Sequence, residues 1–132
     1  MKLLLDTDHC IYAFKQVRSV VEEMRKRSPD GIGVSVVTEA ELRAGAVKSN
    51  APLKALRVIE LFLTPLTIFD FTSADAMAYA HIRATLERAG TPIGPLDIMI
   101  AAQAIARDLT LVTNNEREFR RVSGLRLENW RR

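Results

Sequence analysis

Short apolar runs alternate with segments of helical periodicity along most of the chain, and this alternation restricts the fold more than any other feature. The runs expected to form strands are Leu3 to Leu5, Ile32 to Val36, Leu66 to Phe71 and Thr110 to Thr113, with a weaker strand near Leu125 to Leu127. Repeated alternation of this kind favours a parallel sheet with helices on both faces. At 132 residues the chain is large enough for one core, so we predict a single domain over residues 1–132.

Apolar residues at helical spacing predict that the segments between these strands are helices. One helix is indicated by Ile11, Phe14, Val17, Val21 and Met24, and it is expected to stop at Ser28 and Pro29. The other predicted helices run from Thr38 to Gly45, from Leu53 to Leu63, from Ala74 to Ala89 with Ser73 as N-cap, from Leu96 to Arg107, and over a short stretch after Asn115. The predicted class is therefore α/β, with three α/β/α layers around a short, mainly parallel sheet.

The composition is that of a globular protein of the cytoplasm. Hydrophobic residues make up 48% and charged residues 27% of the chain, and no apolar run approaches the roughly 20 residues that cross a bilayer. Only three leucines precede Asp6, too few for a secretion signal, so we expect a cytoplasmic location and no membrane partner. Cys10 is the only cysteine and is expected to pack as a small buried hydrophobe.

Positive charge is concentrated in two segments although the net charge is only +3. Residues 15–27 carry five Lys or Arg against two Glu, and residues 117–132 carry six Arg. Such segments suit a polyphosphate partner. A solvated helix face and an ordinary basic tail explain the same charges equally well.

Two aspartates follow the first predicted strand, in the sequence LLLDTDHC. The side chain of Asp6 is expected at the carboxyl edge of the sheet, where parallel α/β sheets bind ligands. Either Asp6 or Asp8 can cap the helix that follows, and we assign the cap to Asp8. Because one capping residue is enough, Asp6 is left without a structural role and becomes a candidate for chemistry.

Two glutamates occupy the junction after the second predicted strand, in VTEAELRAG. Thr38 and Glu41 match the Ser/Thr-x-x-Glu capping box, which offers a structural explanation for Glu41. Glu39 lies four residues before Arg43 and is expected to form an exposed ion pair. Glu41 shares a helical stripe with apolar residues and should lean toward the interior edge, so we favour Glu41 for chemistry.

The last two junctions carry further acids. Asp97 heads the buried stripe of its helix, because apolar residues follow it at i+3, i+4, i+7 and i+8. A first-turn aspartate gains roughly 0.3 to 1 kcal/mol from the helix dipole on any face, so the dipole does not explain a carboxylate directed at the core. In VTNNEREF, Asn115 and Glu118 can form another cap and its partner. All of these acids fall at strand-to-helix junctions, which open on one edge of a parallel sheet.

Carboxylates that converge at one edge need a cation. Two of them about 4 Å apart repel each other by roughly 4 kcal/mol at an effective dielectric constant near 20. Oxygen ligands without His or Cys select Mg²⁺ or Mn²⁺ rather than zinc. His9 and His81 do not form a ligand spacing and are expected to be surface or partly buried side chains. A metal held by these acids activates water and stabilises charge on a phosphodiester during its hydrolysis.

Four blocks of the sequence, taken in order, carry a resemblance to a known family: LLDTD, SVVTEAELRAG, GPLDIMIAAQA and LVTNNEREF. They are similar to the PIN-domain ribonucleases, specifically the VapC-type toxins of toxin-antitoxin pairs, over nearly the whole chain. The resemblance implies a PIN-like fold and a metal-dependent endoribonuclease that cleaves RNA, including structured RNA such as tRNA. It also implies a homodimer, and a cognate VapB-type antitoxin whose tail occupies the active-site groove.

The same resemblance assigns roles to individual residues. The implied catalytic acids are Asp6, Glu41, Asp97 and Glu118. The implied ligands of Mg²⁺ or Mn²⁺ are Asp6 and Asp97, with Glu41 and Glu118 acting directly or through water. The implied supporting residues are Thr7, Thr113 and Asn115, the last of which stands where many relatives carry an additional acid. The family often has Asn at the position of Asp8, so the role of Asp8 stays open.

Three other interpretations compete with the nuclease. Aspartate-nucleophile phosphatases also place Asp-x-Asp after an apolar strand, but they expect Thr or Val at the position of Cys10, a later Lys and an additional cap domain. The acids and the Lys of a response-regulator receiver domain cannot be assigned together in this chain. In a non-catalytic binding module, the basic segments hold RNA or a protein and the acids only cap helices. Tight Mn²⁺ binding separates the nuclease from the module.

Overall fold

The computed structural model describes residues 2–28 and 31–131 of the chain. Within these ranges, five short parallel strands form one sheet in the order β3-β2-β1-β4-β5. The strands are β1 (Leu3–Leu5), β2 (Ile32–Ser35), β3 (Thr67–Phe69), β4 (Thr110–Val112) and β5 (Arg126–Glu128). The central strand is β1, in which Leu5 pairs with Val34 on one side and with Val112 on the other.

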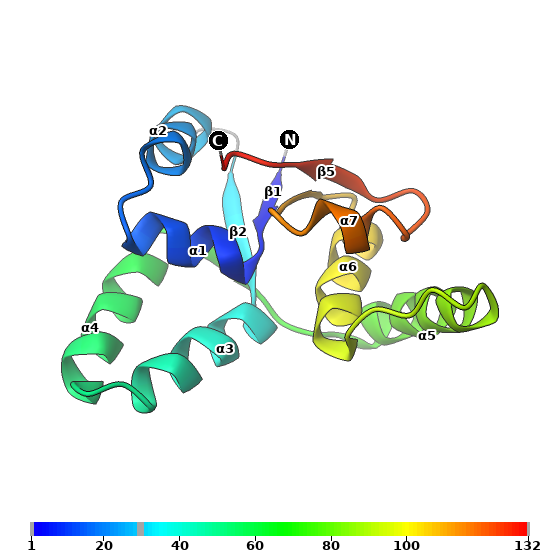
Figure 1. Cartoon of the computed structure of the whole chain (residues 1–132), viewed down its shortest axis with the longest axis horizontal. Helices are drawn as coiled ribbons and strands as arrows, with labels where there is room; N and C mark the ends of the chain where they lie inside the picture. Colours follow the sequence, from blue (N-terminus) through cyan, green and yellow to red (C-terminus); the bar gives the residue numbers. More distant parts are fainter. Residues whose placement is uncertain (1, 29–30, 132) are drawn as a thin grey trace.

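Helices cover both faces of this sheet (Figure 1). The helices of the described ranges are α1 (Thr7–Phe14), α2 (Arg18–Arg27), α3 (Val36–Val47), α4 (Pro52–Leu63), α5 (Ser73–Arg88), α6 (Pro95–Arg107) and α7 (Glu116–Phe119). Helices α1 to α4 pack on one face, and α5, α6 and the short α7 pack on the other. The predicted α/β class and its three layers are confirmed. The described helices all lack the combination of length and continuous hydrophobicity that a bilayer-spanning helix needs.

The pleat of β1 explains why the core has two halves. Leu3 and Leu5 belong to the apolar cluster beneath α1 to α4, whereas Leu4 belongs to the cluster beneath α5 and α6. Successive side chains of a strand point to opposite faces, so both sides of β1 need apolar residues. All three leucines are fully buried, and β1 is therefore a rigid base for the residue that follows it.

Two of the predicted helices differ from those in the structure. The single helix expected from Ile11 to Met24 is the pair α1 and α2, because Gln16 takes a φ of 58° and ends the first helix there. The apolar repeat continues through this break, so periodicity alone cannot reveal it. The predicted stop at Pro29 lies outside the described residues. The N-cap of α5 is Thr72 rather than Ser73, since Thr72 forms a capping box with Asp75.

The strand order reverses beside β1, and the edge of the sheet at this reversal is called the crevice below. From β1 the chain continues to β2 and β3 on one side of the sheet, while β4 and β5 lie on the other side. Ligand sites of open α/β sheets lie beyond the carboxyl ends of the strands at such a reversal of order. Asp6 directly follows β1 and Thr113 directly follows β4, so the candidate site lies between these two strand ends.

Candidate active site

Asp6 is the most buried carboxylate of this edge, with 6% of its surface exposed. Its N–H donates to the carbonyl of Val112 at 2.9 Å, which extends the pairing of β1 with β4 by one residue. Its carboxylate accepts the N–H of Thr7 at 2.8 Å and the hydroxyl of Thr113 at 2.7 Å. Asp6 is thus the N-cap of α1, and the assignment of that cap to Asp8 was wrong. Helix α1 begins directly after Asp6, which leaves the cap to this residue.

The electrostatic environment of Asp6 favours its protonated form. Burial, followed by the negative charge of Asp8, raises the pKa of Asp6 from 3.8 to about 7. Asp97 contributes a smaller increase, and the hydrogen bonds from Thr113 and Thr7 act in the opposite direction. The raised pKa of Asp6 therefore comes mainly from burial, with nearby negative charge from Asp8 and, to a smaller extent, Asp97.

Glu41 reaches the site from α3 through a contact that the sequence does not indicate. The N-cap of α3 is Ser35, whose hydroxyl accepts the N–H of Val37 at 2.9 Å, so the capping box expected between Thr38 and Glu41 does not form. The hydroxyl of Thr7 instead donates to the Glu41 carboxylate at 2.7 Å. The Glu41 side chain is exposed at the crevice, although it was expected to lean toward the interior.

Thr38 and Glu39, the two other polar residues considered near the start of α3, do not contact the acids of the crevice in the same way as Glu41. The hydroxyl of Thr38, which is fully buried, forms a hydrogen bond with that of Thr7 at 3.1 Å and so helps to hold the Thr7 side chain in place. Glu39 forms the predicted ion pair with Arg43, at 2.9 Å. This ion pair gives Glu39 a structural role. Thr7 is the link that brings the end of β1 and the first turns of α3 together.

Asp97 enters the crevice from the first turn of α6. Burial raises its pKa, and the charges of Glu118, Glu41 and Asp8 raise it further, in that order. Within the described residues, its carboxylate forms neither a hydrogen bond nor an ion pair with the protein. Asp97 is thus a half-buried carboxylate near other acids that forms no hydrogen bond or ion pair in the part of the chain that the structure describes.

Glu118 lies on α7, the short helix that follows β4 in the chain. The amide of Asn115 donates to its carboxylate at 3.3 Å, and the N–H of Asn115 donates to the hydroxyl of Thr113 at 3.0 Å. Asn115 occupies the N-cap position of α7 but forms no side-chain cap, so its side chain serves to hold Glu118. The charges of Glu118, Glu41 and Asp8 act on Asp97, and that of Asp97 acts on Asp6, so carboxylates from four separate segments lie near one another at this edge of the sheet.

Asp8 and His9 form a contact that sequence analysis missed. The Asp8 carboxylate accepts the N–H of Asn114 at 3.0 Å through one oxygen, and its other oxygen lies 2.8 Å from Nδ1 of His9. His9 is fully buried rather than at the surface, and the backbone N–H of Trp130 donates to its Nε2 at 3.1 Å. No signal in the sequence links His9 with a residue 121 positions later. Cys10 is buried, as predicted, and burial raises the pKa of its thiol.

The donor chemistry of the site fits a hard divalent cation. The charged groups described above are carboxylates, and burial followed by their mutual repulsion raises the pKa values of Asp6 and Asp97; a bound cation would remove this repulsion. Within residues 2–28 and 31–131, however, no three acidic, imidazole or thiol groups are close enough to hold one ion by themselves. Coordination that is completed by water agrees with Mg²⁺, which usually retains several waters in protein sites.

The basic segments predicted from the sequence are partly neutralised. In the first of them Arg18 pairs with Glu22 and Arg27 with Glu128, and in the second Arg120 pairs with Glu116. These pairs reduce the positive field that the arginine count alone suggests.

An apolar groove extends from the acidic crevice between α1, α3 and α4. Its volume is about 390 Å³, and its walls include Ile11, Phe14, Leu42 and Val58. Thr7 and Glu41 also line the groove, so it reaches one of the acids. A mainly apolar pocket of this volume falls in the range of ligand-binding pockets.

Comparison with known proteins agrees with this architecture over the full chain. A family model described as “PIN domain” matches residues 3–125. A curated protein of Shigella flexneri, “tRNA(fMet)-specific endonuclease VapC”, is 44% identical over 130 residues, which cover 98% of each chain.

Two solved structures are similar to this one in both sequence and fold. The structure of “VapBC2 from Rickettsia felis bound to a DNA fragment from their promoter” has a TM-score of 0.94 and 37% identity, and covers 98% of this chain and 99% of that one. The structure of “DNA bound VapBC from Salmonella typhimurium” has a TM-score of 0.94 and 41% identity, and covers 98% of both chains.

Proposed function

The chain belongs to the PIN-domain family and, within it, to the VapC-type ribonucleases, and we propose that it is a Mg²⁺- or Mn²⁺-dependent endoribonuclease whose acids are Asp6, Glu41, Asp97 and Glu118. PIN-domain ribonucleases in general depend on a divalent metal. The observation that carries the residue assignment is the environment of Asp97. Its raised pKa arises from burial and from acids of three other segments, and its carboxylate forms no hydrogen bond or ion pair within residues 2–28 and 31–131.

In this proposal each acid has a distinct task. Asp6 and Asp97 would hold the cation, with Glu41 and Glu118 acting directly or through water. The bound cation supplies a more acidic water and stabilises negative charge on the scissile phosphate. Thr113 keeps Asp6 oriented through its 2.7 Å hydrogen bond. Thr7 does the same for Glu41, and Asn115 for Glu118.

The environment of Asp6 argues against the phosphatase alternative. A nucleophilic aspartate must be ionised and able to approach a phosphorus atom. Asp6 is 6% exposed, both of its oxygens accept hydrogen bonds, and its pKa is raised to about 7. The binding-module alternative explains Asp6 as a cap, but it gives no task to Asp97.

A cleavage assay with the purified protein tests the activity and its metal requirement. We expect total RNA to be cut in Mg²⁺ or Mn²⁺, to remain intact in EDTA, and to be cut again when excess Mn²⁺ is added. Because the Shigella relative is named for tRNA(fMet), we propose tRNA as the substrate and the cytoplasm as the location. Cleavage that proceeds equally well in EDTA would refute the metal-dependent mechanism.

We further propose that the apolar groove binds a segment of a cognate antitoxin. Two of the similar structures are VapBC complexes, and the groove is apolar along its walls and is also lined by Thr7 and Glu41. A helix with one apolar face fits such a groove, and its end can enter the crevice and block RNA. This arrangement accounts for inhibition without any change in the fold.

The substitution Val58→Glu tests this groove. Val58 lies on α4, lines the groove and is 46% exposed, so the fold should tolerate the change. The new glutamate would be buried when the antitoxin binds, and it should weaken antitoxin binding by at least about tenfold. The free enzyme should cleave RNA at the parental rate. Leu53→Glu is the control, because Leu53 is on the same helix, is 85% exposed and does not line the groove. Equal antitoxin affinity of the two variants, measured by calorimetry, would place the antitoxin elsewhere.

A further inference from the structure

We propose that His9 is a positioning residue of this ribonuclease. In this role it fixes the Asp8 carboxylate at the rim of the acidic crevice, and its own orientation is set by the backbone of the C-terminal segment. The inference rests on the proposed function, since the acids that Asp8 faces are those assigned to metal binding and cleavage.

The hydrogen bonds of His9 allow only one arrangement of its ring proton. Nε2 lies 3.1 Å from the backbone nitrogen of Trp130, and a backbone N–H can only donate, so Nε2 must accept. The ring proton is then on Nδ1, which lies 2.8 Å from the Asp8 carboxylate and donates to it. Because the hydrogen bond on one ring nitrogen decides the role of the other, the contact with Trp130 directs His9 toward Asp8.

The Asp8 carboxylate is fixed at both of its oxygens. One accepts the His9 ring N–H, and the other accepts the N–H of Asn114 at 3.0 Å. The side chain is nevertheless 28% exposed, and the Thr113 hydroxyl that donates to Asp6 at 2.7 Å also lies 3.4 Å from the Asp8 carboxylate. After burial, the negative charge of Asp8 is the next cause of the raised pKa of Asp6, and it adds a smaller increase to the pKa of Asp97, after burial, Glu118 and Glu41. The charge of Asp8 acts on both proposed metal ligands. Its carboxylate therefore has to stay in one orientation if the electrostatic field at these ligands is to be constant.

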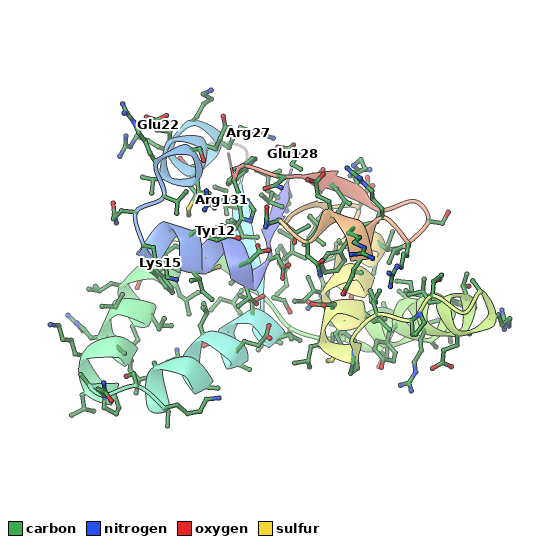
Figure 2. All side chains as sticks on the ribbon, in the orientation of Figure 1. Tyr12, Lys15, Glu22, Arg27, Glu128 and Arg131 are labelled. Atoms are coloured by element: carbon green, nitrogen blue, oxygen red, sulfur yellow. The ribbon has the colours of Figure 1, made fainter. Side chains whose placement is uncertain are left out.

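The C-terminal segment that holds His9 is itself anchored on α1 and α2. Arg27 of α2 donates two hydrogen bonds to Glu128, at 2.7 and 3.2 Å, and the indole N–H of Trp130 donates to the same carboxylate at 3.0 Å. The guanidinium of Arg131 lies 5.1 Å from the centre of the Tyr12 ring. Figure 2 shows Glu128 close to Arg27 and Arg131 close to Tyr12. Contacts outside the crevice therefore fix the position of the Trp130 N–H.

Two conservative substitutions separate positioning from packing. In His9→Asn the side-chain amide lies near the former Nδ1 and can still donate to Asp8, but the acceptor for Trp130 is lost. In His9→Gln the side-chain oxygen lies near the former Nε2 and can still accept from Trp130, but the donor to Asp8 is lost. Both variants remove the ring from its contacts with Tyr12 and Trp130, so loss of packing should affect them alike.

The test measures kcat and KM for RNA cleavage, the melting temperature, and Mn²⁺ affinity by calorimetry in the absence of RNA. We expect His9→Gln to lower kcat by about 10- to 100-fold with little change in KM, and to bind Mn²⁺ more weakly, as is usual when the partner of a site carboxylate is removed. His9→Asn should recover most of both quantities at a similar melting temperature. The matched control is His81→Gln, because His81 is exposed on α5 and should give parental values.

Each outcome decides for or against His9. If His9→Asn and His9→Gln lose cleavage and Mn²⁺ affinity equally, or lose only thermal stability, the histidine is a packing residue and the inference is wrong. If His9→Gln does not fold, Asp8→Ala decides, since parental kcat and Mn²⁺ affinity in that variant would leave nothing for His9 to position. A parental enzyme that fails to cleave RNA would instead refute the proposed function, whereas an active parent with an equally active His9→Gln would refute only this inference.

Discussion

Replacement of Asp97 by Asn is expected to lower RNA cleavage by more than about a hundredfold, because loss of even an indirect partner of a metal ligand typically costs 10- to 100-fold. The substitution removes one negative charge and almost no volume. Asp97 makes no hydrogen bond or ion pair within the described residues, so the fold should not depend on it. Cleavage of a tRNA substrate in Mn²⁺, measured as an initial rate, gives the size of the effect.

The matched control for this experiment is Asp108→Asn at the opposite end of α6. Asp108 is the C-cap of that helix, has a φ of 57°, and accepts a hydrogen bond from Arg126 at 2.7 Å. Asparagine tolerates this left-handed backbone conformation, so the control should fold and cleave RNA like the parent. If the Asp97→Asn protein cleaves at the parental rate, Asp97 has no part in the reaction.

Asp6→Asn is expected to abolish cleavage and to stabilise the metal-free protein above pH 7. The pKa of Asp6 is raised from 3.8 to about 7, so between these pH values the folded state binds a proton that the unfolded state releases. Stability contributed by this proton is fully present below pH 3.8 and is lost as the pH rises to about 7, on the order of 4 kcal/mol in total. The asparagine stays neutral and should not show this loss.

Unfolding in urea at a series of pH values tests this prediction. The parent in EDTA should lose stability steadily between pH 4 and pH 7, whereas Asp6→Asn should show a flatter profile. Added Mn²⁺ should restore the parent at pH 8 and should have little effect on the variant, because a ligand stabilises only the state that binds it. Parallel profiles for the two proteins in EDTA would mean that Asp6 titrates near its ordinary pKa.

The parts of the fold that sequence predicts well are those set by local composition. An apolar run as short as Leu3 to Leu5 is recognisable because both faces of a central parallel strand are buried. The junction after such a strand follows from the chain alone, which is why Asp6 could be assigned to the sheet edge. Asp97 could be selected because it heads a buried helical stripe, a position that has no structural need for a carboxylate.

The features that sequence did not predict depend on contacts between distant segments. The cap of α3 is Ser35 rather than Thr38, because β2 ends one residue before the helix begins. With the helix started earlier, Glu41 is exposed at the crevice, where the hydroxyl of Thr7, 34 residues away, meets it. The link from His9 to Trp130 spans 121 residues and is made through a backbone N–H, which no side-chain pattern can encode.

The position of β5 has a consequence for synthesis of the toxin. The N–H of Thr113 donates to the carbonyl of Glu128 at 2.9 Å, and Trp130 lies against His9. A nascent chain that still lacks residues 126–130 cannot make either contact, although its acids have already been translated. The crevice can therefore be complete only after residues 126–130 have been synthesised and have made their contacts with β4 and His9.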